Sequence, residues 1–154
     1  MNEPILNFML KVLLSKINSK SADIRFLSLK IFTDIIIQYL NDDTIYDSKN
    51  VVSEQLISEN GNNVKATTKF INDLMYMELF PLFKLILQDS DPVPLFGLKL
   101  LSAIVERCPA FVQLFKRFDL TRYISDNYMV NHSRLNRHTI NILKSILESK
   151  ELTF

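Results

Sequence analysis

The segment Ser21–Phe32 (SADIRFLSLKIF) decides the fold, because it recurs without gaps as Ser90–Leu101 (SDPVPLFGLKLL). The residues before the two copies align at the same shift: Leu10, Leu13, Leu14 and Ile17 fall on Leu79, Leu82, Phe83 and Ile86. A weaker third copy places Leu143-Lys144 where Leu98-Lys99 stands. Helix pairs that repeat along a chain are typical of solenoids. The sequence therefore predicts an all-α fold, a right-handed α-solenoid of antiparallel helix pairs with about three repeat units.

The repeated segment has the spacing of a helix with two apolar faces. Ile24, Leu27, Ile31 and Ile35 recur at three and four residues, and Phe26, Leu29, Phe32, Ile36 and Leu40 form a second apolar row. Such a helix is expected to lie between neighbours on both sides. Ser21 is the predicted N-cap, with Asp23 in the positively polarised first turn. Gly97 falls opposite Ser28 at a small-residue position, where close helix contact is expected.

The chain is expected to form one domain, 1–154, built from successive units. Residues 1–40 are the predicted first helix pair, 41–67 a polar insertion, 68–107 the second pair and 109–150 the third unit. The predicted helices are Pro4–Ile17, Ala22–Leu40, Thr68–Gln88, Pro109–Phe118, Asp119–Tyr128 and Ser133–Ser149. One further helix is predicted to begin after the segment Asp89–Pro92 and to end at Arg107. Val51–Ile57 is a candidate short helix in the insertion. Pro81 should bend its helix, since it cannot donate a hydrogen bond to Met77.

Composition narrows the class of protein. With 18 Lys plus Arg against 17 Asp plus Glu, the formal charge of +1 disfavours nucleic acid as the partner. The single Cys108 cannot form an internal disulfide and is expected to be a small buried apolar residue. Nowhere do about 18 uncharged apolar residues run together, so no membrane insertion is expected. The first residues lack the features of a signal peptide, which favours a cytoplasmic location.

The chemistry of a catalytic site is sparse in this chain. The chain has only two glycines, too few for a Gly-rich phosphate-binding loop. Neither a His-Arg-Asp nor an Asp-Phe-Gly motif occurs, so phosphoryl transfer is excluded. His132 and His138 do not have zinc-ligand spacing, and nothing places Cys108 beside them as a nucleophile. The pairs Asp42-Asp43 and Asp89 with Asp91 are expected to cap helices. The prediction is no enzyme, no metal, no cofactor and no small-molecule substrate.

The second copy carries a family resemblance. Its opening, Asp91-Pro92-Val93, resembles the start of the second helix in HEAT and armadillo repeats, where an arginine follows the valine. In the first copy, Ile24-Arg25 matches this pattern. Pro94 stands at the arginine position, which would weaken an arginine-to-aspartate ladder between repeats. More narrowly, Leu79–Leu147 looks like the helical-repeat tail of Fused-type and divergent Unc-51-like serine/threonine kinases. That resemblance implies a noncatalytic tail of a kinase or pseudokinase from ciliary or Hedgehog-type signalling scaffolds, with a cilium or cytoskeleton location.

Charge is divided along the chain. Residues 41–60 are acidic, whereas the segment from Arg107 to Lys144 is basic and contains the candidate protein-binding residues Lys116, Arg117, Arg122, Arg134, Arg137 and Lys144. A row of like charge on one face of a solenoid would dock an acidic protein partner, although an ordinary solvated surface has the same composition. The leading hypothesis is a protein-interaction scaffold. The alternatives are a structural segment of a longer solenoid or oligomer, a nucleic-acid-binding helical domain, and an enzyme.

Overall fold

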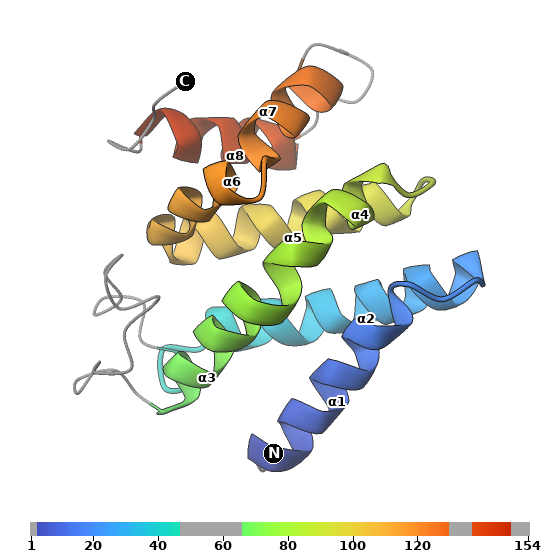
Figure 1. The fold of residues 1–154 in the computed structure, drawn as a ribbon. Helices are drawn as coiled ribbons and strands as arrows, with labels where there is room; N and C mark the ends of the chain where they lie inside the picture. The colour runs from blue at the N-terminus through green and yellow to red at the C-terminus, as the bar shows by residue number, and fades with distance from the viewer. Residues whose placement is uncertain (1–2, 47–65, 130–136, 149–154) are drawn as a thin grey trace.

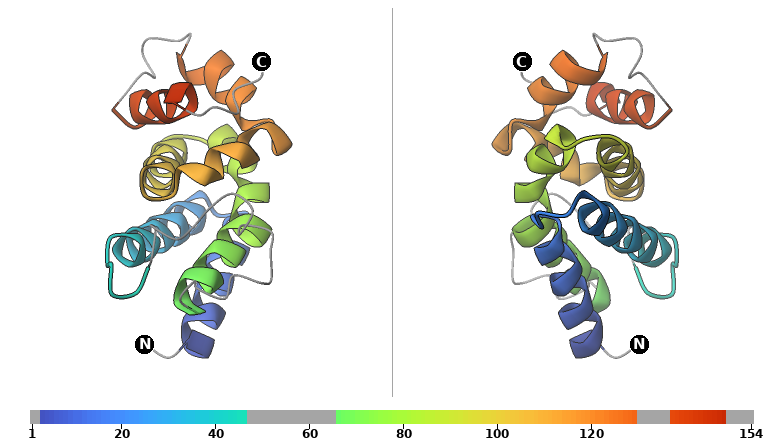
Figure 2. Two further views of the ribbon diagram at one scale, coloured as in Figure 1. Left: turned by 90° about the vertical axis from the view of Figure 1, so that its left-hand side faces the viewer. Right: turned by 90° about the vertical axis from the view of Figure 1, so that its right-hand side faces the viewer.

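The computed structural model describes residues 3–46, 66–129 and 137–148, and these ranges are helical without a strand (Figure 1). The helices form two layers (Figure 2). The layer we call the B layer consists of α2 (Ala22–Leu40), α5 (Val93–Arg107) and α8 (Arg137–Glu148). The A layer consists of α1 (Glu3–Lys16), then α3 (Ala66–Leu74), η3 (Met75–Leu79), η4 (Phe80–Leu82) and α4 (Phe83–Gln88), then η5 (Pro109–Val112), α6 (Gln113–Arg117), α7 (Leu120–Ile124) and η6 (Ser125–Met129).

Successive B-layer helices pack on one another, α2 on α5 and α5 on α8, while α1 pairs with α2 and α4 with α5. Each unit therefore adds one helix to each layer and contacts its neighbours along the stack, as Figure 2 shows in two opposite views. This arrangement confirms the predicted all-α solenoid. The candidate helix Val51–Ile57 and the start of the predicted helix at Ser133 lie outside the described residues.

Helix α2 begins and ends where the sequence predicts. The Ser21 hydroxyl accepts a hydrogen bond from the Ile24 amide at 3.4 Å, which caps the helix, and Asp23 lies in the first turn. The row Leu29, Phe32, Ile36 and Leu40 is buried. The other apolar row was expected to be covered as well, and this expectation is wrong: Ile24, Leu27 and Ile31 are 44%, 52% and 47% exposed. The reason is that α1 and α5 pack on two other sides of α2, and no described helix covers the side that carries these three residues.

The first helix of the second unit is continuous in space but not in its hydrogen bonding. After α3 it widens into the π turn η3, tightens into the 3-10 turn η4, and returns to α-helix at Phe83. Pro81 lies in η4, where its missing N–H was expected to interrupt the helix. The sequence thus located the irregularity, and the structure shows that adjacent π and 3-10 turns absorb it.

Gly97 lies at a close contact between the two helices of the second unit. A Cβ atom built on Gly97 would lie 2.6 Å from Ile86 Cγ2 of α4, which is far inside normal contact distance. Ser28, at the same position of the first unit, is also buried. The expectation of a small residue at a close helix contact is therefore confirmed.

The helices of the third unit are less regular than those of the other two units. The predicted helix Pro109–Phe118 starts as the 3-10 turn η5 before it becomes α6, and the predicted helix Asp119–Tyr128 ends as the π turn η6. Asp119 separates them with a left-handed backbone, φ 57°. Its carboxylate accepts a hydrogen bond from Lys84 Nζ at 3.1 Å, which ties this corner to α4.

Aromatic side chains fill the A-layer core. Phe80 packs edge-on against Phe83 with ring centroids 5.1 Å apart, and it stacks on Phe111 at 5.4 Å. The hydroxyl of buried Tyr128 donates to the Leu87 carbonyl at 2.7 Å. Because these contacts join the second and third units, the core runs through the stack rather than closing within one unit.

Candidate functional site

A groove of about 360 Å³ lies across the B layer and draws side chains from all three of its helices. Its lining residues are Ile37, Asn41, Lys99, Ser102, Ala103, Glu106, Arg107, Arg137, His138 and Asn141. The end of α2, the second half of α5 and the start of α8 therefore meet at this place. Eight of these ten side chains are polar or charged, so the groove offers partners to a polar or charged segment.

Two of the basic residues in this groove differ in their role. Arg107 Nε donates to the Leu40 carbonyl at 2.7 Å, and its Nη2 pairs with Asp43 Oδ1 at 2.5 Å, so Arg107 fastens the end of α2 to the end of α5. Lys99 lies half-buried, with its ammonium 5.8 Å from the centre of the Phe96 ring. Arg107 is thus mainly structural, whereas Lys99 is available to a ligand.

His138 is half-buried in the same groove, rather than the surface imidazole that the sequence suggested. Burial lowers its pKa below the ordinary value of 6.5, and the positive charges of Arg137 and Lys99 lower it further, while Glu106 opposes them. The imidazole is therefore neutral at pH 7. The positive potential of the groove comes from Lys99 and Arg137, with Glu106 as an acidic neighbour.

The predicted basic residues do not fall on one layer. Lys116 and Arg117 lie on α6 and Arg122 on α7, in the A layer, whereas Arg137 and Lys144 lie on α8, in the B layer. Arg134 lies outside the described residues. The structure brings Arg137 into the groove and leaves the A-layer residues elsewhere. A binding role for any of the six remains a prediction.

Some of these side chains have partners within the protein. Arg117 hydrogen-bonds the Tyr76 hydroxyl and lies over the Tyr76 ring at 5.2 Å, so it links α6 to η3. Arg122 and Lys144 form one-turn ion pairs with Asp126 and Glu148, each at 3.9 Å. Exposed pairs of this length contribute little to stability, and their cations can turn toward a ligand.

Sequence reasoning missed Lys99, Arg107 and His138 as groove residues. A signal for Lys99 was present, since Lys30, Lys99 and Lys144 occupy the same position in the three copies of the repeat. Each B-layer helix therefore carries a lysine in register. Arg107 and His138 have no such signal, because their place depends on how α2, α5 and α8 cross.

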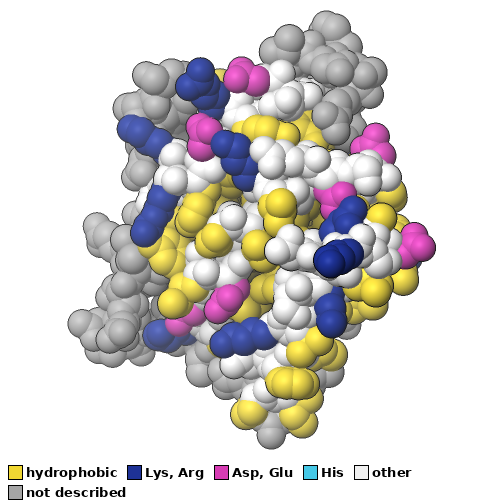
Figure 3. Space-filling view, turned by 45° about the vertical axis from the view of Figure 1, so that its right-hand side comes forward, with side chains coloured by type: hydrophobic (Ala, Val, Ile, Leu, Met, Phe, Trp, Pro, Cys, Tyr) yellow, Lys and Arg dark blue, Asp and Glu magenta, His cyan; other side chains and the backbone are white. Residues whose placement is uncertain are grey.

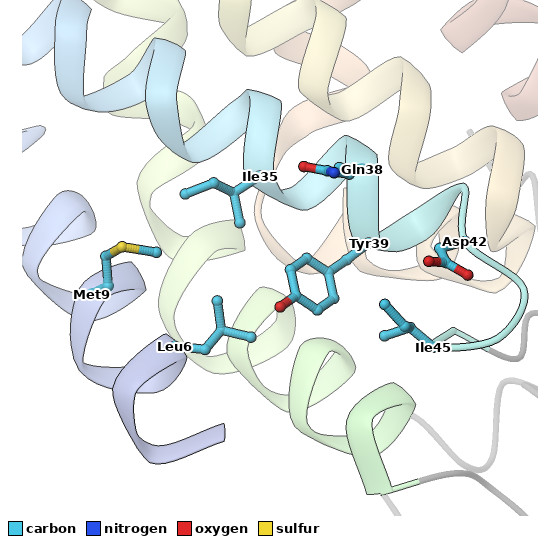
Figure 4. A pocket seen from close by; sticks show the side chains of 7 residues that line it. All are labelled: Leu6, Met9, Ile35, Gln38, Tyr39, Asp42 and Ile45. Carbon is cyan, nitrogen blue, oxygen red and sulfur yellow. The ribbon is translucent and has the colours of Figure 1, made fainter. Parts of the chain in front are cut away.

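A second, smaller groove of about 220 Å³ lies between α1 and α2. Figure 4 shows Leu6 and Met9 from α1 facing Ile35 and Tyr39 from α2, with Gln38, Asp42 and Ile45 also in its lining. Most of these side chains are apolar. Unlike the B-layer groove, this one offers hydrophobic contact and little charge.

The predicted capping carboxylates have mixed roles. Asp42 Oδ1 accepts from the Thr44 amide at 2.9 Å and shapes the turn after α2. Asp89 accepts from the Ser90 amide at 2.7 Å, but its main partner is Arg25, whose guanidinium lowers the Asp89 pKa through a side-chain hydrogen bond. Arg25 and Asp89 thus form an arginine-to-aspartate rung between the first and second units. These carboxylates are engaged in structure.

Cys108 is buried, as predicted, with 1% of its surface exposed. Burial raises the pKa of its thiol to about 11, which leaves it protonated and a poor nucleophile. In the described ranges, no group of at least three His, Cys, Asp or Glu side chains is placed to hold a metal ion. Within the same ranges, no helix combines the length and apolar character that crossing a membrane requires.

Comparison with known proteins identifies the family. Residues 1–113 match the family model of HEAT repeats of ULK4-like serine/threonine-protein kinases. Neither the curated proteins nor the solved structures contain a match to the chain. HEAT repeats are typically helical scaffolds for protein interaction, which fits the stacked helix pairs. The match spans the first two units and reaches the start of α6, and the chain belongs to the family of HEAT repeats of ULK4-like kinases.

Proposed function

We propose that this chain is a noncatalytic protein-interaction scaffold whose B-layer groove binds an acidic segment of a protein partner. The observation that carries the proposal is the groove itself, in which Lys99 and Arg137 converge from two helices beside a neutral His138. Two cations with polar neighbours attract carboxylates and repel like charge. The name of the family supports a setting in a kinase or pseudokinase signalling protein. A location in the cytoplasm, at the cilium or cytoskeleton, is part of this proposal and rests on the sequence resemblance alone.

A fluorescently labelled Glu-rich peptide tests the groove. Its anisotropy is measured against the wild-type chain, a groove variant, Lys99→Glu with Arg137→Glu, and a matched A-layer variant, Lys116→Glu with Arg122→Glu. Both variants change the net charge equally, so a long-range effect of total charge would weaken both. We expect the groove variant to bind at least about tenfold more weakly and the control to stay within about twofold.

Three results would contradict the groove as the site: equal losses for the two variants, a loss confined to the A-layer variant, or no binding by the wild-type chain. Binding should also weaken as salt is raised, because the Debye length falls from about 10 Å at 0.1 M to about 3 Å at 1 M. A Gln-rich peptide of the same length separates carboxylate recognition from backbone binding and is expected to bind weakly.

A further inference from the structure

One end of the stack exposes an unusual amount of apolar surface. On α1, Ile5, Phe8 and Val12 are 59%, 72% and 39% exposed, and on α2 the row Ile24, Leu27 and Ile31 is exposed as well. We call these six residues the N face. In Figure 3, hydrophobic side chains gather at the lower end of the molecule, where α1 lies. Apolar residues clustered at the end of a helical stack mark a surface that another element covers.

The internal repeat shows what the α2 part of the N face is built to contact. Ile24, Leu27 and Ile31 align with Val93, Phe96 and Leu100 of α5. In α5, Val93 and Leu100 are 2% and 0% exposed, and Phe96 packs edge-on against Phe26 of α2 at 5.3 Å. In the second unit these positions are buried or, at Phe96, half-buried, with Phe96 against the preceding B-layer helix, whereas in the first unit all three are exposed.

The other end of the stack carries the complementary half of that contact. The alignment of Leu143-Lys144 on Leu98-Lys99 places Ile142 and Ile146 of α8 at the positions of Ser28 and Phe32, and both isoleucines are buried as those residues are. In that register Ile140 corresponds to Phe26, the residue that covers Phe96. Ile140 is 52% exposed, and Leu147, one turn beyond Leu143, is 65% exposed.

We infer that the chain associates with a second copy of itself, head to tail, with α8 of one copy packing on the N face of the next. Ile140 of the first copy would contact Leu27 of the second as Phe26 contacts Phe96 within the chain. The occupant is a second copy because the chain already contains this unit-on-unit interface between α2 and α5, and the described helices leave apolar residues of both halves of it exposed, Leu27 on α2 and Ile140 on α8. The contact residues differ from Lys99 and Arg137, so this inference is independent of the proposed function.

A head-to-tail contact uses two different surfaces and leaves a free one at each end, so it extends with concentration instead of stopping at a dimer. Sedimentation of the full chain over a concentration series should therefore show a rising mass. Leu27→Glu removes one surface and Ile140→Glu the other. Each variant alone should weaken association at least about tenfold. Leu85→Glu, at a 44% exposed position of α4, is the matched control and should associate like the wild type.

Mixing the two variants gives the decisive measurement. The Leu27→Glu chain keeps its α8 surface and the Ile140→Glu chain keeps its N face, so together they should form a one-to-one pair and nothing larger. A wild-type chain that is monomeric throughout the series overturns the inference. So does an Ile140→Glu variant that associates like the wild type, since this would indicate symmetric pairing through two N faces.

Cysteine pairs keep the test valid if a glutamate variant fails to fold. Leu27→Cys and Ile140→Cys chains, mixed and oxidised, should yield a disulfide-linked dimer of one chain of each kind. Neither chain alone should crosslink through its new cysteine, because native Cys108 is buried and the matching residue is missing. Mixing Leu27→Cys with Leu85→Cys is the control. Equal crosslinking in the control mixture, or none in the Leu27 and Ile140 mixture, contradicts the head-to-tail contact.

Discussion

Arg25 and Asp89 form a bidentate ion pair between the first and second units. Arg25 Nε lies 2.7 Å from Asp89 Oδ2, and its Nη2 donates to Asp89 Oδ1 at 3.1 Å, while Nη1 donates to the Ser19 carbonyl at 2.9 Å. At the opposite end of α2, Arg107 holds Leu40 and Asp43. An arginine therefore ties each end of α2 to the second unit, Arg25 to the end of α4 and Arg107 to the end of α5, with Phe26 and Phe96 in contact between α2 and α5.

The Arg25–Asp89 pair predicts an acid-sensitive part of the stability. Arg25 lowers the Asp89 pKa below 3.8, so the contribution of the carboxylate is fully present above its unfolded pKa and is lost as pH falls through the folded value. The difference in free energy of unfolding between the wild type and Asp89→Asn should be constant from about pH 7 to 5 and shrink below about pH 4. Urea denaturation at each pH measures it. Asp73→Asn, which breaks an exposed one-turn pair with Lys69, is the control and should cost little.

Gly97→Ala should destabilise the chain although alanine favours helix. The added Cβ would lie 2.6 Å from Ile86 Cγ2, and such overpacking costs about 1–3 kcal/mol, against a gain in helix propensity of about 0.5–1 kcal/mol. Thermal and urea denaturation would measure the net loss. Adding Ile86→Leu removes the branched methyl and should restore part of the stability. A Gly97→Ala chain as stable as the wild type would show that α4 and α5 are not in close contact here.

Tyr46→Phe should cost about 1–3 kcal/mol, because it leaves buried Asn72 without its hydrogen bond. The Tyr46 hydroxyl donates to Asn72 Oδ1 at 2.7 Å, and both side chains are buried. Replacing both partners, Tyr46→Phe with Asn72→Leu, removes the unpaired acceptor and should be less destabilising than the sum of the two single changes. Chemical denaturation of the wild type, the two single variants and the double variant completes this double-mutant cycle. An additive result would mean that the hydrogen bond does not couple α3 to the segment after α2.

Cys108 should react slowly with thiol reagents until the chain unfolds. Burial raises its pKa from 9.0 to about 11, so the thiolate fraction at pH 8 falls by about a hundredfold, and the surrounding core slows access further. The rate of reaction with a disulfide reagent, followed by absorbance in buffer and in urea, measures this protection. Rapid labelling of the folded chain would mean that Cys108 is not enclosed.

The sequence predicted what depends on local rules. Ser21 and the apolar spacing fix both ends of α2, and Pro81 locates the irregular turns between α3 and α4. Neither pattern says whether a neighbour is present, so Ile24, Leu27 and Ile31 were wrongly expected to be buried. Apolar periodicity reports which faces of a helix can be covered, and only the stack shows which faces are.

The candidate site was harder to predict because it depends on distant parts of the chain. Arg122 and Arg137 are close in sequence, but the chain passes from the A layer to the B layer between them. Conversely, Arg25 and Asp89 are 64 residues apart and in contact. Helix capping rules reach only neighbouring turns, so they could assign Asp89 to its own helix end but not to Arg25.

The interrupted helix from α3 to α4 has a consequence for how the protein unfolds. Its η3 turn contacts α1 of the first unit, and α4 contacts α7 of the third, so a single segment touches both neighbours. Unfolding of either outer unit would remove the packing contacts that it makes with this segment. The three units are therefore expected to melt in one cooperative transition, in contrast to long repeat arrays that come apart piece by piece.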